Sequence, residues 1–580
     1  MGACASGQAA FCTRAGLQRE TARRTRPFAG RARGFSPLEA QTQIIRPRVE
    51  RAALLLLAAA VALLFAAFAV IALSSLVSTC SIDPAFYANE EILYTLDNIP
   101  LNLLALCGAF ALCVCLALRF PRALARVNLR LVAALLLLLV LLLGAAWVMA
   151  VDCQPEYDSR YITMAAASAS RNDFSPLLDG YFRRFPYQLG YVFLLELQQR
   201  LLGAENFIGL GLVNVLCLVG AYAALLCITR RLFSDRRVLF FTLLLLPLFL
   251  QGPLFCTFIY GNLPGLCPML WGVYFVLRFF QTGRARLLLP AAPLLALAVL
   301  AKPNYWIAVL ACGIAALLHL LAAKRWQGLA AVLLAALLAS GALRGVTLRY
   351  ERLADTTFGP GTPQTAWLAM GMGGSYMAPG WYNGYTRSIL PDNGYDADRA
   401  RTQIREDLRR NLAKMQDPAY AAAFFGRKLL SQFQETSFES IFVSKDAQNG
   451  RPVPAAAEWV YGQGESGLLR YFDLYMQFVY VFAAAGLFLL LRSLRRARKG
   501  FAGRRPSALP EPLSAGAAVS LCVLPVILLG GFLYHMLFEG KSQYILVYIP
   551  LLLPYAAFGL SAAVDAAAAL LRRGSVRAAE

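Results

Sequence analysis

The stretch LVAALLLLLVLLLGAAWVMAV, residues 131–151, runs directly into the polar segment DCQPEYD, residues 152–158. The first part is long and apolar enough to cross the roughly 30 Å hydrocarbon core of a bilayer as one helix. The second part sets three carboxylates, Asp152, Glu156 and Asp158, at the mouth of that helix. Because a bilayer penalises charge, carboxylates held at this boundary are candidates for a functional site.

The composition extends this pattern to the whole chain of 580 residues. Apolar residues make up 58% of it and the mean hydropathy is +0.55, whereas soluble domains carry about 45–50% apolar residues. The net charge of +22 comes from arginines that cluster in short segments between apolar runs, as the positive-inside rule requires. We therefore predict an all-α polytopic membrane protein, in the cell membrane, and no nucleic-acid partner.

Charge placement predicts the topology. Residues 1–51 are basic and poor in apolar side chains, which predicts a disordered cytoplasmic arm. The segment Tyr187–Leu201 is only about 15 residues long and contains Glu196, so we expect it to lie at the membrane interface rather than to cross. Every later basic loop then faces the cytoplasm, both termini are cytoplasmic, and twelve spans remain: about Ala52–Leu76, Leu101–Leu118, Leu131–Val151, Phe207–Thr229, Val238–Pro253, Leu266–Phe280, Leu287–Leu300, Tyr305–Leu321, Ala330–Leu343, Leu474–Leu491, Ala515–Leu533 and Tyr544–Leu560.

The spans divide the chain into five parts. After the arm, residues 52–130 hold two spans, and residues 131–345 form a membrane core with an outer loop at residues 152–206. Residues 346–470 form a large extracytoplasmic segment whose middle, Asp396–Phe425, has helical composition, and residues 471–580 hold the last spans and a cytoplasmic tail. Cys80 and Cys153 fall at the outer ends of two spans, where they could pair or remain free thiols.

Motifs in the outer loop carry a resemblance to a known family. Residues 158–174 read DSRYITMAAASASRNDF, and residues 181–207 read YFRRFPYQLGYVFLLELQQRLLGAENF. An acid that opens a short helix, then Asp173–Phe174, then Pro186, then Leu202–Gly203 resembles the first outside loop of the GT-C glycosyltransferase superfamily. The similarity is to protein mannosyltransferase-like enzymes and bacterial lipid A aminoarabinose transferases.

Further segments are similar to multi-span relatives of Gram-positive bacteria. They are KPNYWI at Lys302, WLAMGMGGSYMAPGWYNGY at Trp367, FQETSFESIFVS at Phe433 and GGFLYHMLFEGKSQYILVYIPLLLPYAAFGL at Gly530. The resemblance implies a GT-C-like arrangement of helices. It covers roughly Leu131–Leu560, so the arm and the first two spans lie outside it.

The resemblance implies an enzyme that transfers a sugar from a polyprenyl phosphate to a hydroxyl of a cell-envelope polymer or protein, outside the membrane. A carboxylate would take the hydroxyl proton as general base. Asp158 is the first candidate, Glu156 and Asp152 are alternatives, and capping of the following helix is the structural alternative for Asp158. Two carboxylates there could hold Mg²⁺ or Mn²⁺, although Ser159 stands where the relatives have a second acid.

The leaving phosphate needs cations where its charge develops. Lys302 lies at the outer boundary between two spans, where it could bind a lipid phosphate or merely extend its ammonium to water. The other candidates for the phosphate are Arg183, Arg184 and Lys541. Those for sugar or acceptor binding are Trp381, Tyr382, Asn383 and Glu539, although interfacial aromatics can be ordinary membrane anchors and Glu539 could pair with Lys541.

Two other classes of protein compete with the enzyme. A lipid-linked saccharide flippase or another transporter would place ionisable residues inside its spans, facing a central path. A polysaccharide polymerase or ligase would depend on arginine or histidine outside the membrane. The acids of this chain crowd the outer boundary and the spans are nearly free of charge, which favours the glycosyltransferase, with membrane lipids as its surroundings.

Overall fold

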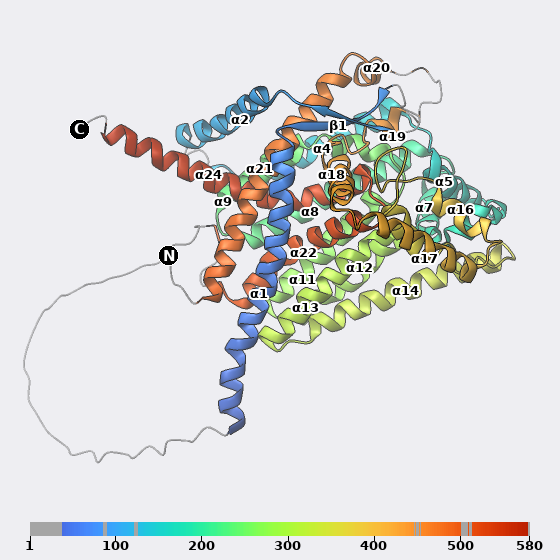
Figure 1. The fold of residues 1–580 in the computed structure, drawn as a ribbon, viewed down its shortest axis with the longest axis horizontal. Helices are drawn as coiled ribbons and strands as arrows, with labels where there is room; N and C mark the ends of the chain where they lie inside the picture. The colour runs from blue at the N-terminus through green and yellow to red at the C-terminus, as the bar shows by residue number, and fades with distance from the viewer. Residues whose placement is uncertain are drawn as a thin grey trace, which may run out of the picture. The chain divides into compact units, whose positions relative to one another are not determined.

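The computed structural model describes residues 37–84, 90–120, 126–445, 447, 452, 454–499, 508–509 and 513–577. Within these residues the chain is almost entirely helical (Figure 1). Ten helices of the described part are long and apolar enough to cross a membrane: α1 (Pro37–Ser74), α2 (Ile99–Arg119), α4 (Leu129–Val151), α8 (Phe207–Leu232), α11 (Asn262–Thr282), α13 (Trp306–Ala323), α14 (Gln327–Leu353), α21 (Glu465–Arg498), α22 (Ala515–Leu537) and α24 (Ile549–Arg577). The described part of the chain is thus nearly all-α, and its long apolar helices agree with the expectation of a multi-pass membrane protein.

Two of the twelve expected spans take other forms. The fifth is α9 (Arg236–Leu248) followed, after a bend of 43°, by α10 (Gln251–Leu254) and η4 (Phe255–Thr257). Pro247 and Pro253 lie at this bend, and a proline removes a helical hydrogen bond and kinks the helix. The seventh is the shorter unit of η5 (Ala285–Leu287) and α12 (Leu288–Ala301). The count of twelve stays a prediction.

The first helix begins before the expected end of the arm. It starts at Pro37 and is apolar from Arg48 onward, whereas the arm was expected to reach Arg51. Residues 1–36, which carry the rest of that expectation, lie outside the described residues. From Arg48 on, α1 lies beside α21 (Figure 1), and the ring centroids of Phe65 and Phe488 are 5.6 Å apart.

The polar connections between the long helices hold most of the short elements. Between α4 and α8 lie α5 (Tyr157–Ser170), η2 (Ser175–Leu178), α6 (Gly180–Arg184), η3 (Pro186–Gln188) and α7 (Leu189–Leu202). Between α14 and α21 lie α15 (Thr365–Gly371), α16 (Tyr385–Asp392), α17 (Ala397–Lys414), α18 (Pro418–Phe433), α19 (Phe442–Lys445) and α20 (Ala455–Tyr461). The helical middle expected at Asp396–Phe425 is present as α17 and the first half of α18. The segment α23 (Ser542–Ile545) and η8 (Leu546–Tyr548) leads into α24.

The one sheet among the described residues is a hairpin that the sequence analysis did not predict. It joins β1 (Ser78–Ile82) to β2 (Ile92–Leu96), antiparallel, between α1 and α2. Both strands contain β-branched residues, Thr79 and Ile82 in β1 and Ile92 and Thr95 in β2, which favour a pleated, half-buried strand. Cys80 lies on this hairpin and Cys153 follows α4; both are buried and pack in different apolar clusters, so no disulfide joins them in this structure.

A buried carboxylate fastens α7, the segment expected at the membrane interface, to α14. Glu196 on α7 accepts hydrogen bonds from Arg349 at 2.8 Å and from the Tyr350 hydroxyl at 2.6 Å, both on α14. Arg200, one turn further along α7, donates to it at 2.9 Å. Because Glu196 is only 1% exposed, its negative charge can be buried only because these partners neutralise it and donate hydrogen bonds to it.

We expect the Glu196→Gln variant to unfold at a lower temperature in detergent, with a loss of about 2 kcal/mol in the free energy of unfolding. The reason is that Arg200 and Arg349, whose side chains are partly exposed, lose the buried carboxylate that they share. The matched control is Glu205→Gln, since Glu205 pairs with Arg171 at 2.9 Å but both side chains are exposed. Thermal melting of both variants checks the prediction, and equal melting temperatures would contradict it.

Candidate functional site

Asp158 lies in the first turn of α5, and its side chain is exposed. The N-cap of α5 is Glu156, so Asp158 is not the residue that caps the helix. Its Oδ2 accepts a hydrogen bond of 2.9 Å from the hydroxyl of Tyr260. That tyrosine also receives a hydrogen bond from the Gln188 side chain at the end of η3. The outer loop and the connection before α11 therefore meet at this carboxylate.

The connection that carries Tyr260 fits closely against the end of α12. Gly261 has a φ of +76°, a conformation that favours glycine. A Cβ at this position would lie 2.3 Å from the carbonyl oxygen of Ala301, so only glycine allows this approach. The next residue after Ala301 is Lys302, and the close contact brings its side chain next to Tyr260.

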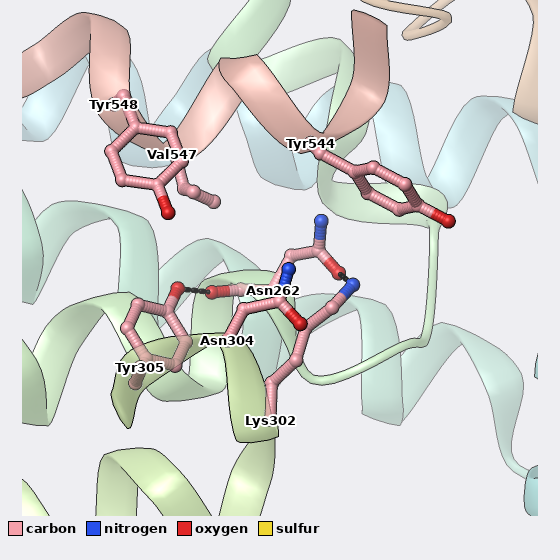
Figure 2. A pocket seen from close by; sticks show the side chains of 7 residues that line it. All are labelled: Asn262, Lys302, Asn304, Tyr305, Tyr544, Val547 and Tyr548. Carbon is pink, nitrogen blue, oxygen red and sulfur yellow. Dashed lines mark hydrogen bonds between the residues drawn. The ribbon is translucent and has the colours of Figure 1, made fainter. Parts of the chain in front are cut away.

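Lys302 occupies the break between α12 and α13, where Pro303 opens the short helix η6 (Pro303–Tyr305). Figure 2 shows its Nζ donating a hydrogen bond to the side-chain oxygen of Asn262. The same ammonium lies 4.5 Å from the ring centroid of Tyr260 and 5.5 Å from that of Tyr544. Burial lowers the pKa of Lys302 to about 7, while the negative charges of Asp158 and Glu539 oppose this shift.

Lys302 lines a narrow polar cleft between the start of α11, the break before α13 and the segment before α24 (Figure 2). The lining residues are Asn262, Lys302, Asn304, Tyr305, Tyr544, Val547 and Tyr548. A second cleft also reaches Tyr548 but is otherwise apolar, with Phe68 of α1, Phe433, Phe532 of α22 and Leu552 of α24 among its walls. A charged cleft and an apolar cleft thus share one tyrosine.

Glu539 brings a second carboxylate to the same place. It follows the end of α22 and is half-buried. Burial raises its pKa to about 7, against the opposing charge of Lys541, and repulsion from Asp158 adds to the rise. Tyr260 contacts both Asp158 and Lys302, and Glu539 is close enough to both charged groups for their charges to act on its own. We call this group of side chains the recess.

The environment of Asp158 raises its pKa above the ordinary value. The first cause is the removal of water by the surrounding protein; hydrogen bonds from Tyr260 and Tyr181 and the charges of Lys541 and Lys302 oppose it. The carboxylate is nevertheless exposed. A side chain that opens into a recess walled by protein satisfies both observations, because it stays accessible while many protein atoms surround it.

The structure places the two alternative carboxylates elsewhere. Asp152 is exposed at the end of α4, where it adopts a left-handed φ of +45°. Glu156 lies 4.0 Å from the exposed guanidinium of Arg160, one turn along α5. Burial raises the pKa of both Tyr187 and Tyr260. The negative charge of Asp158 adds to both shifts, and that of Glu539 adds to the shift of Tyr187.

Arg183 and Arg184 on α6 make contacts of other kinds. The guanidinium of Arg183 stacks on the ring of Tyr395, 4.0 Å from its centroid. The backbone carbonyl of Arg184 accepts a hydrogen bond of 2.8 Å from the N–H of Thr362. These contacts fasten α6 to the segments before α15 and α17, and they do not bring either guanidinium to Lys302.

Of the three residues of the motif GWYNGY that were expected to bind sugar, only Tyr382 lies near the acids of the recess. Trp381 is fully buried and donates a hydrogen bond of 2.9 Å to Ser431, so the expectation that it stacks on a sugar is corrected: its ring fills the core. Asn383 closes its own loop through the carbonyl of Gly374, at 2.8 Å. Tyr382 is half-buried. Burial is the main cause that raises its pKa, and the negative charges of Asp158 and Glu539 add to the rise.

Lys541 is held by two buried acids instead of by Glu539. Its Nζ forms ion pairs with Glu90 of the hairpin turn and, at 3.0 Å, with Glu439. The sequence analysis missed both acids, as it missed Tyr260 and Gln188. The quoted motif FQETSFES contains Glu439, and the quoted stretch of residues 181–207 contains Gln188; neither Glu90 nor Tyr260 lies in a quoted motif.

The acids of the recess do not form a metal cage by themselves. Among the residues that the structure describes, no group of three or more His, Cys, Asp or Glu side chains has the geometry to hold a metal ion. Asp158 already accepts a hydrogen bond from Tyr260. The positive charges that the geometry does supply are those of Lys302 and Lys541.

Comparison with known proteins identifies no relative of this chain. No family model, no curated protein and no solved structure matches the chain. The functional argument rests on the geometry of the recess.

Proposed function

We propose that this protein is a membrane glycosyltransferase that moves a sugar from a polyprenyl-phosphate donor to a hydroxyl of a cell-envelope polymer or protein. The observation that carries the proposal is that an accessible carboxylate, Asp158, and a buried ammonium, Lys302, both contact Tyr260. The recess opens at the break between apolar helices. A reaction between a lipid-linked phosphate and a water-borne hydroxyl needs this combination of groups.

The proposed reaction divides the work between the two charged groups. Asp158 accepts the proton of the acceptor hydroxyl as its oxygen forms a bond to the anomeric carbon of the sugar. The bond between that carbon and the phosphate oxygen breaks, and the electron pair leaves with the polyprenyl phosphate. Lys302, oriented by Asn262, stabilises the negative charge that develops on this phosphate.

The two clefts are the proposed binding sites for the phosphate and for the isoprenoid chain of the donor lipid. We place the phosphate at the cleft beside Lys302 and the isoprenoid chain along Phe532 and Phe433 beyond Tyr548; each cleft has a volume of about 10 Å³, so the donor widens both as it binds. Burial of the lipid chain is favourable by about 0.8 kcal/mol for each CH₂ group. The recess lies at the ends of α4, α12 and α22, which the charge pattern of the loops assigns to the extracytoplasmic face.

The test is a transfer assay with purified protein in liposomes. The probes are radiolabelled polyprenyl-phosphate mannose, glucose and arabinose, offered separately with a cell-envelope extract as the acceptor. We expect label from one donor to move into the polymer or protein fraction. Movement of the lipid between leaflets without transfer of label would contradict the proposal in favour of a transporter, and joining of preformed saccharide chains would favour a ligase.

A further inference from the structure

The hairpin between α1 and α2 is fastened to the segments that surround the recess. The N–H of Cys80 on β1 donates to the carbonyl of Gln434 at 3.0 Å, and the N–H of Ile92 on β2 donates to the carbonyl of Met377 at 3.0 Å. One edge of the hairpin therefore binds the segment after α18, and the other binds the segment after α15. These contacts pair backbone groups, as in a sheet.

The turn of the hairpin carries an acid into the protein. Glu90 is 8% exposed and its carboxylate meets the ammonium of Lys541, which is 7% exposed. Glu439, fully buried, is the second partner of Lys541 at 3.0 Å. Ser542 donates to Glu439 at 3.1 Å and the backbone N–H of Glu439 donates to Glu435 at 3.0 Å. A buried ammonium is thus held by two acids from distant parts of the chain.

The backbone at both acids is strained. Glu90 has a φ of +53° and Glu439 a φ of +57°, in the left-handed region that side chains rarely adopt. Such conformations cost about 1–3 kcal/mol each and persist only where surrounding contacts impose them. Two strained acids that converge on one lysine indicate that the position of Lys541 matters.

Lys541 fixes the short loop that carries Glu539. The loop Phe538–Lys541 joins α22 to α23, and the N–H of Gly540 donates to the carbonyl of Gly380 at 2.9 Å. A Cβ on Gly540 would lie 2.5 Å from the Gln432 side chain, so the loop has little room to move while its end is held. The loop carries Glu539, whose pKa is raised by burial and, in addition, by the negative charge of Asp158.

We propose that Glu90 is a positioning residue of the recess: by holding Lys541 together with Glu439, it fixes the loop that carries Glu539 opposite Asp158. This proposal rests on the proposed function. It makes Lys541 an anchor whose charge is satisfied by two carboxylates, and it leaves Lys302 as the cation for the donor phosphate. The hairpin lies outside the part of the chain in which the sequence resembles a known family, yet it completes the recess.

The test compares Glu90→Gln with Glu91→Gln, its neighbour on the same hairpin. Sub-ångström to 1 Å displacement of a reacting group lowers rates by about 10- to 100-fold. We expect a fall in kcat of this size for Glu90→Gln, with the donor KM changed less than about threefold, and no change for Glu91→Gln. The charge reversal Glu90→Lys with Lys541→Glu again places one ammonium beside two carboxylates, so we expect it to recover most of the activity that each single reversal loses.

Hydrogen exchange separates the two proposals. In Glu90→Gln the amide of Gly540 should exchange faster than in the wild type or in Glu91→Gln, whether or not the substrate has been identified. Unchanged exchange, or a double reversal no better than the single ones, would overturn the role of Glu90. Faster exchange in a protein whose wild type transfers no sugar would overturn the proposed function alone.

Discussion

Replacement of Asp158 by asparagine is expected to lower kcat for sugar transfer by about 10²- to 10⁴-fold, the usual effect of losing a general base. The amide keeps the size of the carboxylate and can still accept from Tyr260, so the recess keeps its shape. What disappears is the group that takes the acceptor proton. The donor KM should change little, because Lys302 and the apolar cleft hold the donor.

Two matched variants make this result specific. Asp152→Asn and Glu156→Gln remove the other carboxylates of the same segment, which lie at the end of α4 and beside Arg160. We expect both to retain at least about half of the wild-type kcat, since neither removes the base. Initial rates with a single labelled donor, on variants with wild-type melting temperatures, measure the effect. Full activity of Asp158→Asn, or a larger loss in either control, would transfer the role to another acid.

Removal of the Lys302 charge should have the second-largest effect. In Lys302→Met the side chain keeps its length, but the donor phosphate loses a charged hydrogen bond in a buried cleft, which is worth about 1.5–3 kcal/mol. We therefore expect the donor KM to rise by about 10- to 100-fold, together with a lower kcat because the leaving phosphate is less stabilised. The control is Lys324→Met, a change of the same kind at the other end of α13.

The pH dependence distinguishes Lys302 from a lysine that merely fills space. Because burial lowers its pKa to about 7, the free enzyme loses this positive charge as pH rises through that value. Then kcat/KM for the donor should fall above about pH 7, while kcat should not, since the bound phosphate keeps the ammonium charged. In Lys302→Met this fall of kcat/KM at high pH should vanish. The fall of kcat/KM at low pH should begin at a higher pH, because Lys302 lowers the pKa of Asp158. A pH profile of kcat/KM that is the same as in the wild type would contradict the role of Lys302.

Much of the membrane part could be predicted from the sequence. A run such as residues 131–151 has few alternatives to a helix, because in a bilayer every backbone polar group must be satisfied within the segment. Lys302–Pro303 marks a helix break, as proline cannot continue the hydrogen-bonding pattern. The helices α17 and α18 follow from caps at Asp396 and Asp417, whose side chains accept the first free N–H groups.

The recess could be predicted only in part. Asp158, Lys302 and Glu539 each stand at the end of an apolar run, so a common boundary brings them to similar depth. The partners of Lys541 could not be found in this way, because Glu90 and Glu439 belong to connections whose path depends on tertiary contacts. For the same reason the burial of Trp381 in the core was not visible: the motif GWYNGY reads equally well as an exposed aromatic loop.

The ion pair between Glu90 and Lys541 also sets the order in which the molecule can mature. Glu90 emerges from the ribosome before Lys541, and α22 is among the helices made between them. Until Lys541 has been synthesised, Glu90 and Glu439 have no counter-charge and cannot be buried at low cost. The hairpin and the segment after α18 can therefore take their final places only after α22 has been made.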